Sequence, residues 1–222
     1  MSGLGTHELY ERWAPVYAPE PHNPLMEVEQ QAVLAALPAL RDKTVLDLAC
    51  GTGRYSRLAR QRGARQVVAL DYSPAMLAAM GAGERVRGDL TDLPLRADAF
   101  DVVVAGLALG HASDLVRCMH EIARVLLPGG ALAYSDFHPE ATRRGLERGF
   151  RDATGARFSL PRDGFEVAAH RAALAAAGFR GTCVSELRAG IEMHAQFEGS
   201  ERFYREWHGT PLVLVVRADA PT

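Results

Sequence analysis

Three aspartates stand at the ends of successive apolar runs, and two glycines follow the first of them. Asp47 comes just ahead of Gly51 and Gly53, Asp71 ends the next run, and Asp89 ends a shorter third run. Glycines let a ligand approach the backbone closely, whereas a carboxylate just ahead of them repels a pyrophosphate and can accept an ammonium group. The pattern therefore indicates a nucleoside ligand with a cationic tail.

The second and third aspartates fit the sugar and the base of such a ligand. Asp71 lies 20 residues after Gly51, a spacing at which a carboxylate can accept hydrogen bonds from both ribose hydroxyls. The carboxylate of Asp89 and the next backbone N–H could bind the edge of an adenine. Apolar surface for the ring faces is offered by Tyr72, Met76 and Leu90. A single Asp at a strand end more often forms a turn or a helix cap than a ligand contact. The nucleoside site is therefore predicted from all three acids together with the glycines, and not from any one of them.

Alternating apolar runs and amphipathic segments predict the elements that position these acids. Apolar runs predict strands at 45–49, 66–70, 85–87, 100–105, 131–137 and 213–216. Helical spacing and capping residues predict helices at 25–40, 54–61, 73–80, 114–127 and 165–177. Strands that alternate with helices favour an α/β fold with a doubly wound, mostly parallel sheet and helices on both faces.

Length and composition favour one domain over residues 1–222. The chain is 48% apolar, and its 25 basic and 27 acidic residues nearly balance, so its charge favours neither nucleic acid nor a membrane as partner. The cysteines Cys50, Cys118 and Cys183 form no Cys-x-x-Cys pair. This cysteine pattern indicates neither a disulfide framework nor a metal site. Because the N-terminus has no apolar signal-peptide core, we expect a cytoplasmic protein.

Three segments outside this alternation could cover a ligand. Residues 1–40 combine aromatics and prolines with the first predicted helix, and could supply a lid. Residues 138–164 and 189–210 are candidate insertions that cap a substrate pocket. Plain surface loops are an equally good interpretation of both, since long loops are often but not always functional.

Five segments occur in the order in which one enzyme family carries its motifs. They are Asp47–Gly53, Leu70–Leu77, Gly88–Leu90, Phe100–Ala105 and Glu121–Gly130. In this order they resemble class I S-adenosylmethionine-dependent methyltransferases, and most closely the broad methyltransferase type 11 family. The resemblance covers about residues 10–137. It implies a Rossmann-like seven-stranded sheet with a small cap, S-adenosylmethionine as cofactor and S-adenosylhomocysteine as product.

The resemblance also implies roles for individual residues. The matching positions are Asp47, Ala49, Gly51 and Gly53 for the methionine part, Asp71 for the ribose, Asp89 for the adenine, and Ala105 beneath the sulfonium. Ala49 replaces the first glycine of many members, a small change that still permits close approach. The segment from Tyr10 to Tyr17 resembles one that closes over the cofactor, with Tyr17 in reach of the cofactor carboxylate. Packing of its aromatics onto the domain is the alternative.

Methyl transfer is an in-line displacement, in which alignment and exclusion of water can supply most of the rate and no metal is required. An acceptor hydroxyl or acidic carbon would need a base, and histidine suits neutral pH. His111, after the fourth predicted strand, is the first candidate, although type 11 members often carry a histidine here whatever their substrate. Asp136 and His138, at the end of the fifth, are further candidates.

The acceptor and its methylated atom stay open. The resemblance favours a small biosynthetic intermediate as the acceptor, methylated on oxygen, nitrogen, sulfur or carbon. We expect the protein to be a monomer or a homodimer. Nucleobases are disfavoured as acceptors. Methyltransferases that act on the amino groups of bases carry an Asn or Asp followed by two prolines and an aromatic residue, and no such motif follows Ala105. One alternative is an NAD-type oxidoreductase using Gly51, Gly53 and Asp71, although Ser56 stands at the third glycine position. A non-catalytic subunit that binds S-adenosylmethionine is another.

Overall fold

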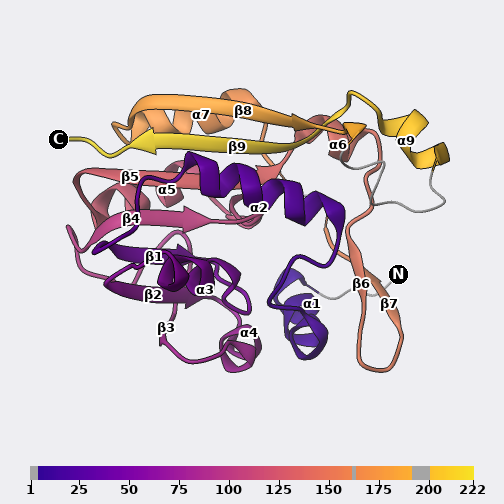
Figure 1. Ribbon diagram of the computed structural model, residues 1–222, viewed down its shortest axis with the longest axis horizontal. Coiled ribbons are helices and arrows are strands. Elements are labelled where there is room, and N and C mark those ends of the chain that lie inside the picture. The colour runs from indigo at the N-terminus through magenta and orange to yellow at the C-terminus, as the bar shows by residue number, and fades with distance from the viewer. Residues whose placement is uncertain (1–4, 162–163, 192–200) are drawn as a thin grey trace.

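Seven strands form one sheet in the computed structural model, which describes residues 5–161, 164–191 and 201–222. The strands are β1 (Thr44–Leu48), β2 (Gln66–Asp71), β3 (Glu84–Arg87), β4 (Phe100–Ala105), β5 (Leu126–Phe137), β8 (Arg180–Arg188) and β9 (Pro211–Asp219). Their order is β3-β2-β1-β4-β5-β9-β8 (Figure 1). The first five pair in parallel, and β9 runs antiparallel to both β5 and β8. The mostly parallel, seven-stranded sheet predicted above is confirmed.

Helices cover both faces of this sheet, and short elements follow its strands. The α-helices are α1 (Thr6–Trp13), α2 (Pro24–Ala36), α3 (Arg54–Gln61), α4 (Pro74–Ala79), α5 (Leu115–Val125), α6 (Pro139–Arg143), α7 (Val167–Ala176) and α9 (Glu201–Trp207). Two short 3-10 helices are η1 (Ala14–Val16) and η2 (Leu109–His111). A separate hairpin pairs β6 (Gly149–Arg151) with β7 (Arg157–Ser159). The hairpin and α1 lie beyond the carboxyl ends of the parallel strands (Figure 1).

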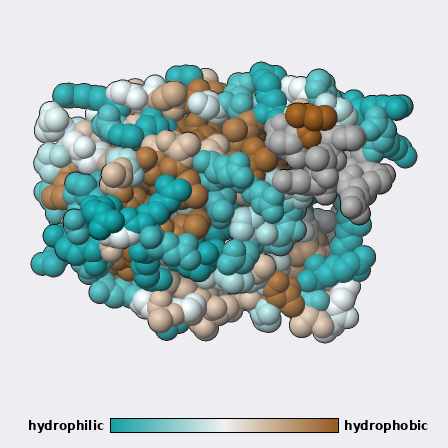
Figure 2. All heavy atoms as spheres, viewed as in Figure 1, coloured by the Kyte–Doolittle hydropathy of each residue, from teal (hydrophilic) through white to brown (hydrophobic). Residues whose placement is uncertain are grey.

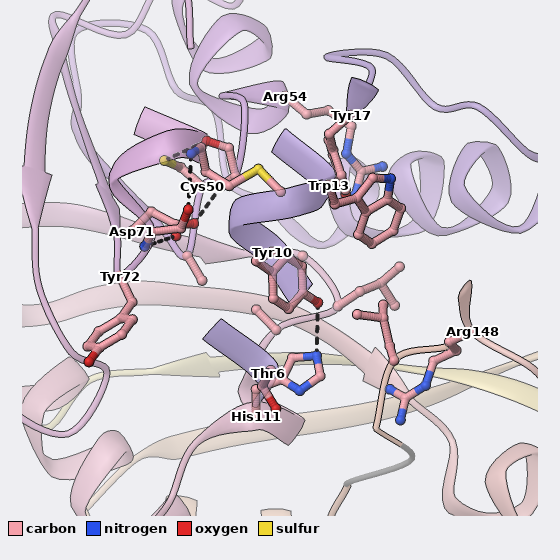
Figure 3. Close-up of a pocket in the computed structure, with 18 of the residues that line it drawn as sticks. Thr6, Tyr10, Trp13, Tyr17, Cys50, Arg54, Asp71, Tyr72, His111 and Arg148 are labelled. Atoms are coloured by element: carbon pink, nitrogen blue, oxygen red, sulfur yellow. Dashed lines mark hydrogen bonds between the residues drawn. The ribbon is translucent and has the colours of Figure 1, made fainter. Parts of the chain in front are cut away.

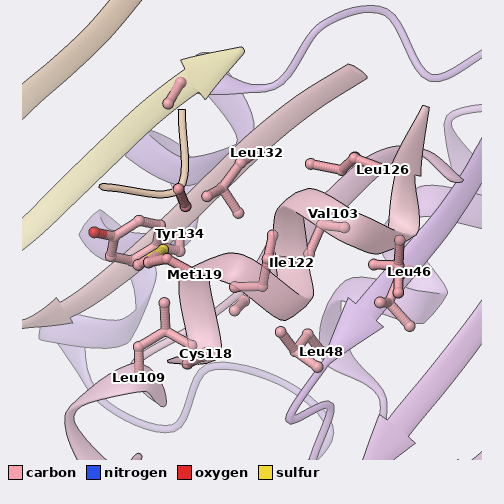
Figure 4. Packing of buried hydrophobic residues seen from close by; sticks show 14 of the residues in the cluster. Leu46, Leu48, Val103, Leu109, Cys118, Met119, Ile122, Leu126, Leu132 and Tyr134 are labelled. Atoms are coloured by element: carbon pink, nitrogen blue, oxygen red, sulfur yellow. The ribbon is translucent and has the colours of Figure 1, made fainter. Parts of the chain in front are cut away.

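The two faces of the sheet carry separate apolar cores, because side chains alternate along each strand. On one face, Leu46, Val103 and Leu132 pack against Met119 and Ile122 of α5 (Figure 4). The opposite core lies under α2 and α3, and its buried members include Val33, Val45, Tyr55, Val102 and Ala131. Because both faces are covered, the central strands are almost wholly buried, which explains their continuous apolar runs.

Local signals explain where three of the helices begin. Side-chain oxygens of Asn23, Ser73 and Asp114 accept the backbone N–H three residues on, at 2.9, 3.1 and 3.0 Å. Prolines at the first position of α2 and α4 suit the helical start, since their missing N–H has no helical partner to lose. The capping pair Ser73–Pro74 predicted the start of α4 correctly.

Several predicted boundaries differ from the structure. The helix expected over 25–40 ends at Ala36, because Leu37 precedes a proline and is extended. β5 begins at Leu126 rather than at 131. The turn at Gly129 lies within this strand, where its pairing with β4 shifts register. No prediction covered β8, whose residues are mostly exposed, as suits a polar edge strand.

The outer surface is mainly polar. Figure 2 shows hydrophilic side chains over most of one face, with smaller apolar groups between them. Large apolar side chains that are exposed in the described chain include Val16, Tyr72, Val116 and Ile191, and single ones are ordinary on protein surfaces. Within the described residues, no helix combines the length and the apolar character needed to cross a membrane.

Candidate active site

A cavity of about 570 Å³ opens beyond the carboxyl ends of the parallel strands, where α/β proteins bind their ligands. Its strand side, as we call it, is formed by Asp47, the loop 49–51, and the segments 70–73 and 88–90. Its hairpin side comes from other parts of the chain, and is formed by Thr6, Tyr10, Trp13, His111, Phe137, Leu160 and the segment 146–149.

Asp47 is buried at the end of β1 and lines the strand side. Its Oδ2 accepts hydrogen bonds from both the backbone N–H and the hydroxyl of Ser56, each at 2.7 Å. Burial raises the pKa of Asp47 to about 6, and these bonds oppose the rise. At this pKa the charged form of the carboxylate predominates at neutral pH, and its bonds join β1 to the first turn of α3.

The loop between β1 and α3 takes a left-handed backbone at three positions. Ala49, Gly51 and Gly53 have φ angles of +52°, +54° and +86°. A Cβ placed on Gly51 would meet nothing nearer than Tyr17 Cε1 at 4.0 Å, so space remains between the loop and Tyr17. A Cβ on Gly53 would lie 2.8 Å from Cγ of Met80, so a side chain at that position would require Met80 to shift.

Asp71 fastens this loop to the end of β2. Its Oδ2 accepts the Gly51 N–H and its Oδ1 accepts the Ser73 N–H, both at 2.8 Å (Figure 3). Burial raises the pKa of Asp71, while the backbone bonds act in the opposite direction. Each carboxylate oxygen has two lone pairs, so Asp71 can still accept bonds from a ligand.

Asp89 closes a tight turn after β3 at the edge of the cavity. Its Oδ1 accepts the backbone N–H and the hydroxyl of Thr91, at 2.8 and 2.5 Å. Leu90, Tyr72 and Met76 also line the cavity. This position is required if they are to contact the faces of the adenine ring. Ala105 is not among the lining residues, and its side chain packs in the core between the sheet and α5.

Tyr10 and His111 meet on the hairpin side, although they are 101 positions apart in the sequence. The Tyr10 hydroxyl lies 3.0 Å from Nε2 of His111, and the two rings pack edge to face (Figure 3). Burial raises the pKa of Tyr10, so its hydroxyl keeps its proton at neutral pH. His111 therefore faces the cavity as predicted, in contact with a phenol that the sequence did not associate with it.

Asp136 lies behind the cavity and does not line it. It is 2% exposed, and its carboxylate accepts the backbone N–H of Phe137 at 2.8 Å and that of Gly110. His170 Nε2 lies 3.7 Å from Oδ2 of Asp136. Burial raises the pKa of Asp136 to about 7 and lowers that of His170 to about 4. Strand alternation explains the difference from our expectation, because it turns Phe137 to the cavity and its neighbours away.

His138 is also turned away from the cavity. Its Nδ1 accepts the backbone N–H of Glu140 at 3.1 Å, which places it as the cap of α6. Its Nε2 lies 3.5 Å from Glu186 of β8, and burial lowers the pKa of His138. The structure therefore gives His138 a capping position rather than one facing an acceptor.

A buried ion pair next to the cavity was not predicted. Glu29 of α2 is fully buried, and its Oε2 lies 2.8 Å from Nη2 of Arg54. Its Oε1 accepts hydrogen bonds from Tyr55, at 2.8 Å, and from Ser135, at 2.5 Å. The signal that could have found it is a lone acid on the apolar stripe of a helix, together with an arginine directly after Gly53.

The candidate capping segments differ in what they contribute. Residues 146–149 and Leu160, within 138–164, line the cavity, and His22 of the N-terminal segment lines it as well. The described part of 189–210 contributes no lining residue. Residues 1–4, 162–163 and 192–200, which include His194 and Phe197, lie outside the described residues. In the described chain, no group of three or more His, Cys, Asp or Glu side chains is placed to hold a metal ion.

Comparison with known proteins connects this geometry to one kind of enzyme. Residues 46–134 match the model of a family described as a methyltransferase domain, of type 11. The crystal structure of an S-adenosylmethionine-dependent methyltransferase from Mesorhizobium loti superposes with a TM-score of 0.69 and 28% identity, covering 86% of this chain and 97% of that one.

Two curated relatives are similar over part of their length. A malonyl-acyl-carrier-protein O-methyltransferase of Enterobacter lignolyticus is 38% identical over 130 residues, which are 57% of this chain and 51% of that enzyme. A 2-phytyl-1,4-naphtoquinone methyltransferase of Thermosynechococcus vestitus is 33% identical over 147 residues, 60% of this chain and 65% of that enzyme. The chain thus spans between half and two thirds of the length of these relatives.

Proposed function

We propose that the chain is a class I S-adenosylmethionine-dependent methyltransferase, and that it transfers a methyl group from S-adenosylmethionine to a small biosynthetic intermediate. The observation that carries the proposal is a single cavity with two unlike sides. Three aspartates and a glycine loop form the strand side, and the Tyr10–His111 pair faces them from the hairpin side (Figure 3).

The strand side fits the cofactor. The open space at Gly51 can take the methionine part, because that backbone has no side chain in the way. Asp47 would hold the amine, since its carboxylate is charged and buried beside the loop. Asp71 would hold the ribose hydroxyls and Asp89 the adenine edge, with Leu90 against the base. When bound, S-adenosylmethionine supplies an electrophilic methyl group on a sulfonium.

The hairpin side would orient the acceptor and keep water out. Tyr10 and Trp13 of α1 line the cavity and would exclude water from it, and exclusion of water strengthens every electrostatic contact inside. His111 is the group that would take a proton from an acceptor hydroxyl or acidic carbon. Tyr10, which stays protonated, would fix the orientation of the His111 ring through the 3.0 Å contact.

The relatives act on different molecules, so the acceptor is proposed here only by class. One relative is named for a malonyl group on a carrier protein, and another for a phytyl naphthoquinone. Against a dinucleotide, Ser56 occupies the third glycine position, and it bonds to Asp47 where a pyrophosphate would approach. Activity without a metal, a cytoplasmic location, and a monomer or homodimer remain predictions.

Calorimetry with S-adenosylhomocysteine and with NAD tests the cofactor. We expect the former to bind in the micromolar range, and tighter binding of NAD would overturn the proposal. The Asp89→Asn variant keeps the oxygen that accepts from Thr91, but replaces the other oxygen with an amide donor. We therefore expect about tenfold weaker binding of S-adenosylhomocysteine.

Asp152→Asn is the matched control. Asp152 forms the same turn with Thr154, with bonds of 2.9 and 2.6 Å, but lies away from the cavity. Its variant should bind like the wild type. An equal loss of affinity for S-adenosylhomocysteine in both variants would mean that the loss comes from disturbing the turn and not from removing an adenine contact. Transfer of label from methyl-labelled S-adenosylmethionine to small acceptors then tests catalysis.

A further inference from the structure

Arg148 brings a guanidinium to the hairpin side of the cavity, and the proposed methyl transfer does not use it. Arg148 lies just before β6 and is 8% exposed, yet it lines the same cavity as Tyr10 and His111. Figure 3 shows Asp71 and Tyr72 on one side of the view, Arg148 on the other, and the Tyr10–His111 pair between them. The guanidinium therefore lies away from the residues that would hold the cofactor.

Two elements fix the position of this charge. Nη2 of Arg148 donates a hydrogen bond to the carbonyl of Pro161 at 2.6 Å, after the second strand of the hairpin. The guanidinium also lies 4.6 Å from the centre of the Phe137 ring at the end of β5, in cation–π geometry. A long side chain held from two directions loses little further freedom when it binds a ligand.

The charge of Arg148 acts on the interior of the cavity. It lowers the pKa of Tyr10 and that of Asp136, in both cases against the larger effect of burial. The neighbouring Glu147 also lines the cavity, but its Oε2 pairs with the exposed Arg157 at 2.6 Å. The hairpin side thus contributes a guanidinium to the cavity, whereas the strand side contributes three carboxylates.

We propose that Arg148 makes the cavity selective for acceptors that carry a carboxylate on an apolar body. This inference rests on the proposed methyl transfer, and it names the class of acceptor. A guanidinium binds a carboxylate through two parallel N–H bonds, with geometric specificity that a neutral amide does not reproduce. The apolar body would contact walls formed by Trp13, Leu25, Phe137, Leu146, Leu160 and Leu212.

Paired acids and amides test this proposal in the full chain saturated with S-adenosylhomocysteine. The probes are indole-3-acetate, phenylacetate and octanoate, each compared with its primary amide by calorimetric or NMR titration. In the wild type, at least one acid should bind about tenfold or more tightly than its amide. In Arg148→Gln this preference should fall to within about twofold, with affinity for S-adenosylhomocysteine unchanged. Arg148→Lys, which keeps the charge without the planar fork, should give an intermediate preference.

Arg151→Gln is the control, because Arg151 belongs to the same hairpin but is exposed and bonds to the Gly155 carbonyl. It should keep the wild-type preference. Equal affinity of acids and amides in the wild type, binding by none of the acids, or an unchanged preference in a folded Arg148→Gln protein would overturn the inference. Failure of S-adenosylhomocysteine to bind the wild type would instead overturn the proposed function, so the two failures are distinguishable.

Discussion

The strand side of the cavity is organised by backbone groups, whereas the hairpin side is organised by contacts between side chains. On the strand side, Asp47 and Asp71 accept N–H groups of the first turn of α3, of the loop and of the start of α4. On the hairpin side, Trp13 stacks on Phe150 with ring centres 4.8 Å apart and planes within 8°. Backbone contacts depend little on the identity of other side chains, so the strand side suits a constant cofactor and the hairpin side a variable acceptor.

The buried charges behind the two sides differ in the same way. Behind the strand side, Glu29 and Arg54 form a close ion pair at 2.8 Å. Behind the hairpin side, Asp136 and His170 lie 3.7 Å apart, and burial shifts both toward their neutral forms. We therefore expect loss of one partner of the first pair to be strongly destabilising, and the second pair to make stability depend on pH.

Removing Glu29 should produce the largest effect. Glu29→Ala leaves the guanidinium of Arg54 buried without its charge partner, so the free energy of unfolding should fall by about 3–5 kcal/mol in urea titration. Glu27→Ala, at an exposed position of the same helix, should change it by less than about 1 kcal/mol. Similar losses in the two variants would contradict the importance assigned to the ion pair.

Asp136→Asn should change the dependence of stability on pH. The pKa of Asp136 in the folded protein, about 7, lies above its ordinary value of 3.8, so folding favours the protonated form. This contribution is complete below about pH 3.8 and is lost as pH rises toward 7. Relative to the variant, the wild type should lose up to about 4 kcal/mol across that range.

Urea titrations of both proteins from pH 4 to 8 measure this difference. His170 is present in both, so the difference isolates Asp136 to a first approximation. Asp152→Asn, at an exposed carboxylate, should follow the wild type between pH 5 and 8. A constant difference between the wild type and Asp136→Asn at every pH would refute the shifted titration.

Gly53→Ala and Gly155→Ala compare the loop of the strand side with the tip of the hairpin. The two glycines have nearly identical φ angles, +86° and +87°, but only Gly53 has a neighbour within 4 Å of an added Cβ. Gly53→Ala should cost about 2 kcal/mol, and Gly155→Ala about 1 kcal/mol from backbone strain alone. Calorimetry should show weaker binding of S-adenosylhomocysteine in Gly53→Ala alone; equal behaviour would remove the distinction.

The smallest expected effect is the coupling between Trp13 and Phe150. A double-mutant cycle with Trp13→Leu and Phe150→Leu keeps apolar side chains at both positions but removes the stacked rings. The interaction free energy in urea unfolding should be about 1 kcal/mol. Additive effects of the two substitutions would show that α1 and the hairpin are stabilised independently of this contact.

The sequence alone was sufficient for the mostly parallel core of the sheet and for the motifs of the strand side. Each strand-side motif joins a strand end to the following turn or helix, so residues such as Asp47, Gly51 and Gly53 are positioned by their own neighbours in the chain. The edge strand β8 escaped prediction because an exposed, polar strand lacks the apolar run that identifies buried ones.

Only the tertiary structure decided what faces the strand side. It brought Tyr10 to His111, placed Phe150 against Trp13, and turned Arg148 into the cavity. It also turned Asp136 away, because alternation along β5 gives neighbouring residues opposite faces, and it placed His138 as the cap of α6. These outcomes depend on contacts between distant segments, and a single sequence carries no local pattern for such contacts. The cofactor could therefore be inferred from contiguous motifs, whereas the proposal for the acceptor class depends on the assembled cavity.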